Sequence, residues 1–161
     1  MRRGAIGVGL MVAVGVCAMP AVPADPTFQI VINEVELNPA GRDAGKEWVE
    51  LLNIGDSEVD LAGWSITYTY RVPGTIVLSE EALMIEPGEF FVFTYPRLML
   101  RNAEPSTIEL RDPDGNVVHS ASSLADEEND GRTWQRISLG DDPLLGDLWL
   151  FREATKGKAI E

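Results

Sequence analysis

Two glutamates flank a tryptophan in the run Glu47-Trp48-Val49-Glu50, and paired carboxylates are the groups that general acid–base catalysis uses. A glycosidase pair needs its carboxyl groups roughly 5 to 9.5 Å apart across a cleft. The run is densely apolar and predicts a β-strand, on which positions three apart point to opposite faces. We therefore expect Glu47 and Glu50 to accept hydrogen bonds from backbone N–H groups or from Arg136, and not to act as a catalytic pair.

A second set of carboxylates lies in one acidic loop, where Asp126, Glu128 and Asp130 are candidate calcium ligands. Calcium takes roughly six to eight oxygen ligands, mostly from carboxylates and carbonyls. The loop lacks the ligand spacing of an EF-hand, and a run of charges is more often a solvated surface. We keep the three residues as calcium candidates, and we expect no cofactor.

Nucleophilic catalysis needs a base, and His119 is the only histidine of the chain. It is adjacent to Ser120 in a strand-like run, where neighbouring side chains point to opposite faces, so a Ser–His pair is not expected. The sequence contains no G-x-S-x-G, P-loop or H-E-x-x-H pattern. We therefore expect a protein that is not an enzyme.

Short apolar runs separated by Gly, Pro, Asp and Asn predict the elements that must position these residues. The sequence Asp-Pro-Asp-Gly at 112–115 predicts a tight hairpin, and the aromatic run at 89–95 is expected at the centre of a sheet. Only 80–85 and 121–129 could hold a helical turn, and the second favours a solvated loop. The pattern predicts an all-β fold, an immunoglobulin-like β-sandwich of about eight or nine short strands. The predicted strands are 28–36, 47–52, 64–69, 75–78, 89–95, 107–111, 116–120, 132–138 and 148–152.

The first 24 residues have the three-part plan of a secretory signal peptide. Arg2 and Arg3 precede an uncharged apolar run, and small residues lead to an expected cleavage after Ala24. The alternative is an uncleaved membrane anchor, although the apolar run is shorter than the ~20 residues that a span needs. Cleavage would leave one domain, 25–161, without Cys17, the only cysteine, and hence without disulfides or a stable membrane span.

The charge balance argues against nucleic acid as a partner. The net charge is −13, and loss of residues 1–24, which hold two arginines and no acidic residue, would make it −15. Nucleic-acid binding draws on neutralisation of phosphates by Lys and Arg. An acidic surface suits solubility, divalent cations or a basic partner instead.

Several motifs, in their order along 28–159, resemble those of the lamin tail domain family. The residues that carry the resemblance and are assigned structural roles are Asn38, Pro39, Glu47, Trp48, Glu50, Asp60, Gly63, Trp64, Trp134, Arg136 and Trp149. The sequence departs from the family at Lys156, where the family usually has proline between Thr and Gly. The resemblance implies an immunoglobulin-like sandwich. In secreted prokaryotic proteins such a domain is commonly an accessory module beside nucleases, phosphatases or other hydrolases.

The motif residues are expected to build the scaffold. Gly63 permits a tight approach before Trp64, which should lie in the core with Trp48, Trp134 and Trp149. Asp60 should cap a turn through its side chain. Ligand stacking on exposed tryptophans and phosphate binding by Arg136 are the functional alternatives to these structural roles.

These observations predict a secreted, non-catalytic binding or adaptor module of prokaryotic type, extracellular or associated with the cell envelope. Its partner would be a protein or a cell-envelope component, contacted through loops or sheet edges. The alternative function is that of a nucleic-acid-binding accessory domain acting beside an extracellular nuclease or other hydrolase. Local support for this alternative comes from Arg152, Lys156 and Lys158 near the C-terminus.

Overall fold

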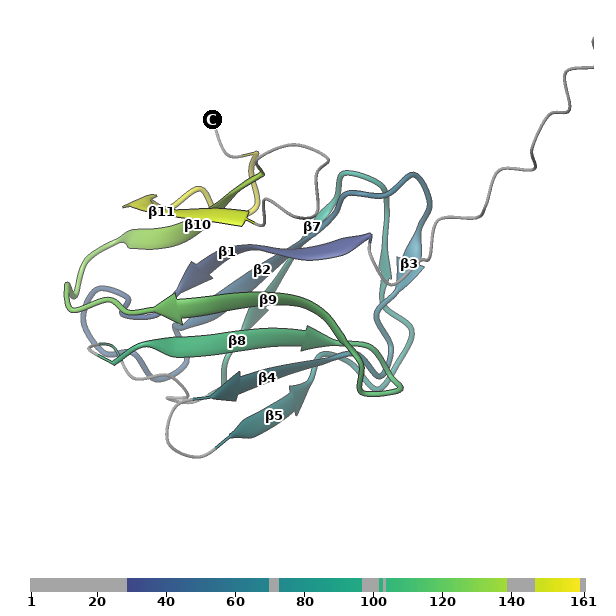
Figure 1. Ribbon diagram of the computed structural model, residues 1–161, viewed down its shortest axis with the longest axis horizontal. Coiled ribbons are helices and arrows are strands. Elements are labelled where there is room, and N and C mark those ends of the chain that lie inside the picture. The colour runs from purple at the N-terminus through teal and green to yellow at the C-terminus, as the bar shows by residue number, and fades with distance from the viewer. Residues whose placement is uncertain (1–28, 70–72, 97–101, 103, 139–146, 160–161) are drawn as a thin grey trace, which may run out of the picture.

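The computed structural model describes residues 29–69, 73–96, 102, 104–138 and 147–159, and within them the chain forms eleven β-strands and no helix. Figure 1 shows two sheets packed as layers, with a small two-stranded pair at one end. No helix within these ranges could cross a membrane, and the expected signal peptide, 1–24, lies outside them. The fold is all-β and immunoglobulin-like, with more strands than the eight or nine expected because the pair β3 and β6 was not foreseen.

The first sheet has five antiparallel strands in the order β11-β10-β1-β2-β7. The aromatic strand β7 lies at an edge of this sheet, so its expected central place was wrong. The centre belongs to β1, every residue of which is buried although three of the seven are polar. Its strands are β1 (Ile30–Glu36), β2 (Trp48–Asn53), β7 (Phe90–Thr94), β10 (Arg132–Ser138) and β11 (Asp147–Glu153).

The second sheet has four antiparallel strands in the order β5-β4-β8-β9. They are β4 (Ser65–Thr69), β5 (Gly74–Val77), β8 (Ser106–Arg111) and β9 (Val117–Leu124). The predicted hairpin is confirmed: β8 and β9 flank the turn 112–115, where Gly115 has φ +85° and Asp112 accepts a hydrogen bond from the Asn116 N–H at 2.8 Å.

The two-stranded pair consists of β3 (Val59–Asp60) and β6 (Met84–Ile85). Its position contradicts the helical turn considered for 80–85. The physical reason is Asp60, whose Oδ1 accepts hydrogen bonds from the N–H groups of Ala62 at 2.9 Å and Leu83 at 2.8 Å. These bonds cap the turn as expected and hold the segment before β6 against β3, so that the pKa of Asp60 is lowered.

The core lies between the two sheets. It is formed by alternate residues of the facing strands, because successive side chains of a strand point to opposite faces. The first sheet contributes Ile32, Val35, Val49 and Leu51, and the second contributes Ile66, Ile108 and Leu110. Trp64 is buried within this core directly after Gly63, whose φ of +75° favours glycine.

Candidate functional site

Carboxylates gather on the outer face of the five-stranded sheet, the face turned away from the core. Glu34 of β1 lies opposite Glu50 of β2, and both are fully buried. They are covered by residues 155–159, which we call the C-terminal strap. Glu34 accepts hydrogen bonds from the Thr155 N–H at 2.9 Å, from the hydroxyls of Thr155 and Thr133, each at 2.6 Å, and from Gln135 Nε2 at 3.3 Å.

Glu50 accepts hydrogen bonds from β1 and from the strap. Its Oε1 accepts a hydrogen bond from Asn33 Nδ2 at 2.9 Å, and its Oε2 accepts one from the N–H of Gly157. The pKa of Glu50 is raised, first by burial and further by the nearby Glu34, while Lys156 acts in the opposite sense. The Lys156 ammonium lies 4.9 Å from the centre of the Trp48 ring. This face therefore binds the strap, and its carboxylates are already used as acceptors.

Glu47 does not join this group. It precedes β2 by one residue, is fully buried, and lies beside the core residue Tyr95, whose pKa is raised by burial and by Glu47. Glu47 and Glu50 thus lie on opposite faces of the sheet, and they do not form the paired carboxylates of an acid–base site. The Arg136 guanidinium, considered as a donor to these glutamates, donates to Asp147 instead, as described below.

The tryptophans divide between the two faces of the sheet. Trp134 and Trp149 are partly buried against the core, and Trp134 Nε1 donates to the Ala125 carbonyl at 2.9 Å. Trp48 is also buried, but it pairs with Glu36 and so lies on the outer face under Lys156. The expectation that Trp48 serves the same core as Trp64 was wrong, because Trp48 lies outside the core cluster and Lys156 of the strap lies over its ring.

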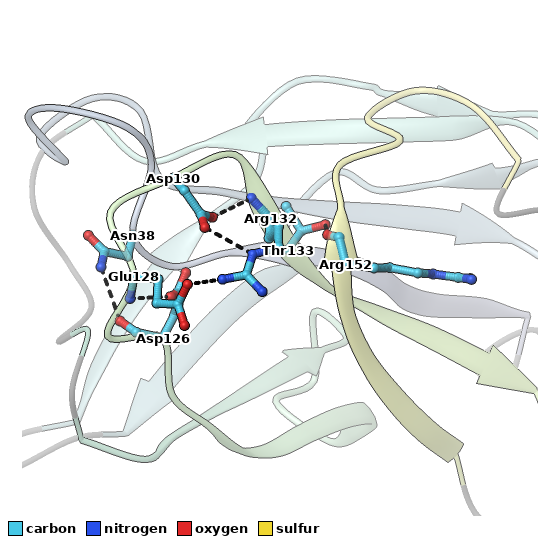
Figure 2. Close-up of polar contacts among 7 residues, drawn as sticks. All are labelled: Asn38, Asp126, Glu128, Asp130, Arg132, Thr133 and Arg152. Carbon is cyan, nitrogen blue, oxygen red and sulfur yellow. Dashed lines mark hydrogen bonds and ion pairs between the residues drawn. The ribbon is translucent and has the colours of Figure 1, made fainter.

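The acidic loop that contains the calcium candidates is organised by an arginine (Figure 2). Arg132 Nε contacts Asp130 Oδ2 at 2.9 Å, its backbone N–H donates to Asp130 Oδ1 at 2.8 Å, and its Nη2 contacts Glu128. Asn38 anchors the loop by donating to the Asp126 carbonyl at 3.1 Å. Across the ranges that the structure describes, no three Asp, Glu, His or Cys side chains are placed to hold a metal ion.

A carboxylate that the sequence reasoning did not select lies next to this loop. Glu36 is buried, and its Oε1 accepts a hydrogen bond from the Asn38 N–H at 3.1 Å. Burial raises the pKa of Glu36 to about 7, and the neighbouring Asp126, Asp130 and Glu34 add to the rise. Burial also raises the pKa of Asp126, whose Oδ2 is buried without a hydrogen-bond partner. The proximity of Glu36 to Asp126 was not predicted, because the two residues are far apart in the sequence.

His119 connects the two sheets. Its Nδ1 accepts a hydrogen bond from the Ile32 N–H at 3.2 Å, beside a bulge in β1, so the proton of the neutral ring is on Nε2. That nitrogen lies 2.7 Å from Asp147 Oδ2, and Asp147 Oδ1 accepts from Arg136 Nη1 at 2.9 Å. Burial lowers the pKa of His119, while Asp147 acts in the opposite sense. The network joins residues of β9, β1, β11 and β10.

Two exposed leucines lie on β11, the strand at one end of the five-stranded sheet. Leu148 and Leu150 are 45 % and 39 % exposed on its outer face. Further along the strand, Arg152 lines an open hollow together with Thr155 and Lys158 of the strap. We call Leu148, Leu150, Arg152 and Lys158 the β11 site. The alternation Leu-x-Leu-x-Arg was the sequence signal for it, but the pattern alone did not show which face is covered.

The fold is that of an immunoglobulin-like domain of the structural kind. The buried carboxylates of its outer face accept hydrogen bonds from the chain itself. The sequence profile of the family described as Lamin Tail Domain matches residues 23–124, more than half of the chain. The chain belongs to this family. The matched region contains Glu34, Glu50 and the Asn38 anchor, whereas β10, β11 and the strap follow it. A comparison with curated protein sequences finds no match.

Proposed function

We propose that this protein is a secreted, non-catalytic module that binds a protein or an envelope component through the β11 edge. The observation that carries the proposal is the pair of exposed leucines on an edge strand. Edge strands present unpaired N–H and C=O groups that another chain can pair with. Natural edges are commonly protected by charge, proline or bulges. Leu148 and Leu150 instead offer an apolar surface beside the open hydrogen-bonding groups.

Non-catalytic action is supported by the way the polar side chains are used. The carboxylates of Glu34 and Glu50 accept hydrogen bonds from the strap, and Asp130 is paired with Arg132. General acid–base catalysis needs a carboxyl group within hydrogen-bonding reach of a substrate. These three groups are committed to the chain itself, and the family is one of structural domains.

Secretion is the part of the proposal that rests on the sequence alone. The signal-like segment 1–24 supports export, and the net charge of −13 suits a soluble domain outside the cell or at the envelope. A fusion of residues 1–30 to a periplasmic reporter enzyme tests this directly. Export of the reporter is expected, and retention of its activity in the cytoplasm would contradict it.

A second candidate, nucleic-acid binding, is favoured by Arg152, Lys156 and Lys158, three cations close in sequence. The Lys156 ammonium lies over the Trp48 ring, and this contact makes it less available to bind a phosphate. The acidic balance of the chain also opposes a polyanion. A gel-shift experiment at low salt with single-stranded and duplex DNA decides the matter, since a retarded band that disappears as salt is added would favour this function.

The binding proposal is tested by recovering partners from envelope and culture fractions with the immobilised protein. The informative variant is Leu150→Lys, which places a charge on the β11 edge. Its matched control is Val77→Lys on β5, the edge strand of the other sheet, because Val77 and Leu150 are both 39 % exposed. We expect a partner that is lost with Leu150→Lys and kept with Val77→Lys. Equal recovery by the two variants would contradict binding at β11.

A further inference from the structure

We propose that the β11 site binds an extended peptide segment in which an acidic residue precedes two apolar residues at alternate positions. The segment would add to the sheet as an antiparallel strand beside β11. This inference rests on the proposed binding function and specifies the chemistry of the partner. Three observations carry it: the register of the β11 side chains, two cations at one end of the strand that form no ion pair with a described residue, and the position of β11 at the sheet edge.

The register places the relevant side chains in a row. Leu148, Leu150 and Arg152 are opposite Ile137, Gln135 and Thr133 of β10, so all three point to the outer face. Alternate residues of a strand are about 7 Å apart, which is also the repeat of any strand that pairs with it. A partner strand therefore presents its own alternate side chains to the same row. Two apolar residues would cover the leucines, and the third position would face Arg152.

The third position favours a carboxylate because, among the described residues, no carboxylate forms an ion pair with the cations there. The Nε of Arg152 donates to Gln135 Oε1 at 2.7 Å, but its Nη2 is buried without a hydrogen-bond partner. In contrast, Arg111, Arg132 and Arg136 each form an ion pair. A carboxylate of the partner beside the guanidinium would add a charge-assisted hydrogen bond and would offset its charge, while the bond to Gln135 stays in place.

The surroundings reinforce this preference. Lys158 lines the same hollow, is exposed, and makes no hydrogen bond or ion pair with the part of the chain that the structure describes. Figure 2 shows Arg152 pointing away from the acidic loop that holds Arg132. Among the described residues neither cation forms an ion pair, and the lining of the hollow carries these two cations against one carboxylate, that of Glu153. Charge complementarity therefore selects an acidic residue in the partner.

The direction of the partner strand follows from the strand pairing. Antiparallel addition is the slightly more stable mode and continues the antiparallel order of β10 and β11. Because β11 runs from Leu148 to Arg152, an antiparallel partner meets Arg152 first and the leucines afterwards. Its sequence pattern is thus acidic-x-apolar-x-apolar from the N-terminal side.

The test measures fluorescence anisotropy of a labelled synthetic peptide titrated with the purified protein. The probe carries a glutamate followed by two leucines at alternate positions, separated and flanked by threonines. A second probe has glutamine in place of the glutamate, and a third has the reversed order. We expect binding of the first probe, and binding weaker by about tenfold or more for the glutamine probe, since a charge-assisted hydrogen bond is lost.

The protein variants identify the contact. Arg152→Gln should weaken binding of the glutamate probe by about tenfold, and it should have no further effect on the glutamine probe, because the two changes remove one interaction. Leu150→Ser should weaken both probes. Val77→Ser and Lys46→Gln, placed outside the β11 site, should change neither. Circular dichroism checks folding, and if Arg152→Gln does not fold, Lys158→Gln and the glutamine probe supply the same comparison.

Several results would overturn the inference. They are equal binding of the glutamate and glutamine probes, preference for the reversed probe, or no binding of any probe. The proposed function would survive these results if a partner were still recovered through Leu150 and not Val77. Loss of both the probe binding and the Leu150-dependent recovery would remove the proposed function as well.

Discussion

Glu34 and Glu50 lie opposite one another on β1 and β2, fully buried, and residues 155–157 donate hydrogen bonds to both. Like charges in direct register on neighbouring strands are ordinarily destabilising. The strap offsets this with two backbone N–H groups and a hydroxyl, and it brings the Lys156 ammonium over Trp48. The two glutamates therefore hold the C-terminal strap against the outer face of the sheet. Residues of the strap in turn line the hollow of the β11 site.

Removing the first of these carboxylates should be severely destabilising. Glu34→Ala removes the acceptor of the Thr155 N–H and hydroxyl and the nearer acceptor of the Thr133 hydroxyl, whereas Gln135 Nε2 still donates to the Glu153 carbonyl. Each buried donor without a partner costs about 1–3 kcal/mol, so we expect the free energy of unfolding to fall by at least ~3 kcal/mol. Urea denaturation measures it. Glu58→Ala, at an exposed glutamate, is the control and should change little; similar losses in both variants would contradict the role of Glu34.

The strap itself can be tested by a change that keeps its shape. Thr155→Val removes the hydroxyl that donates to Glu34 Oε2 at 2.6 Å and leaves the backbone bond in place. A hydrogen bond to a charged group contributes roughly 1.5–3 kcal/mol, so the unfolding free energy should fall by about that amount. Thr94→Val, at an exposed threonine of β7, is the matched control. An unchanged urea midpoint for Thr155→Val would show that the strap is not fixed by Glu34.

Much of this fold could be predicted from local sequence. The turn at Asp112-Pro113-Asp114-Gly115 is encoded within four residues, and the alternation of strands β4 and β8 marks their core faces directly. The position of β7 could not be found in this way. Its aromatic residues indicate that its side chains pack against other residues. Its place at the edge depends on the strand pairing, in which β7 pairs with β2 on one side and with no described strand on the other.

The outer-face cluster was beyond sequence reasoning for a related reason. Glu50 and Gly157 are 107 residues apart, and nothing near Glu50 indicates that a distant segment covers it. Trp48 was assigned to the core because burial was equated with the core, yet the strap buries it from the other side. The raised pKa of Glu36 likewise comes first from burial and in part from Asp126, which is distant in the sequence. Residues whose environment is built by non-local pairing are the ones that pattern alone misplaces.

Glu36 should make the protein less stable as the pH rises. Its pKa is about 7 in the folded state against 4.5 ordinarily, so between these values the folded state binds the extra proton. The stability contributed by the protonated group is therefore full below pH 4.5, is lost as the pH rises to about 7, and stays lost above it. Burial is the main cause of the raised pKa, and the neighbouring Asp126, Asp130 and Glu34 add to it.

The measurement is the difference in unfolding free energy between Glu36→Gln and the unmodified protein. Glutamine keeps an oxygen to accept the Asn38 N–H and carries no charge. We expect the variant to be more stable by up to ~3 kcal/mol at pH 8 and of similar stability at pH 4, from ~1.4 kcal/mol for each pH unit of the interval. A constant difference across this range would show that Glu36 titrates normally.

His119 should make the protein less stable as the pH falls. Its pKa is lowered by burial, so the unfolded state binds the proton more readily, and stability is full above the unfolded pKa of about 6.5 and falls as the pH drops through it. His119→Ala should cost about 1–3 kcal/mol at pH 8, because the buried Ile32 N–H loses its acceptor. His119→Asn, which can supply an oxygen near the position of Nδ1, should recover part of this loss. Guanidinium denaturation at pH 8 and pH 5 tests both points, and an equal pH response in the unmodified protein and His119→Asn would contradict them.

Calcium should have no specific effect on this protein. Arg132 pairs with Asp130 and Glu128, two of the three candidate ligands, and Asp126 Oδ1 accepts from the Glu128 N–H at 2.8 Å. The guanidinium thus supplies the positive charge that a cation would bring. We expect the melting temperature to be the same with EDTA and with calcium, after comparison with magnesium at equal ionic strength, since screening alone acts on so acidic a chain. A saturable rise in melting temperature with calcium and not with magnesium would show that the loop binds the ion and that Arg132 yields its partners to it.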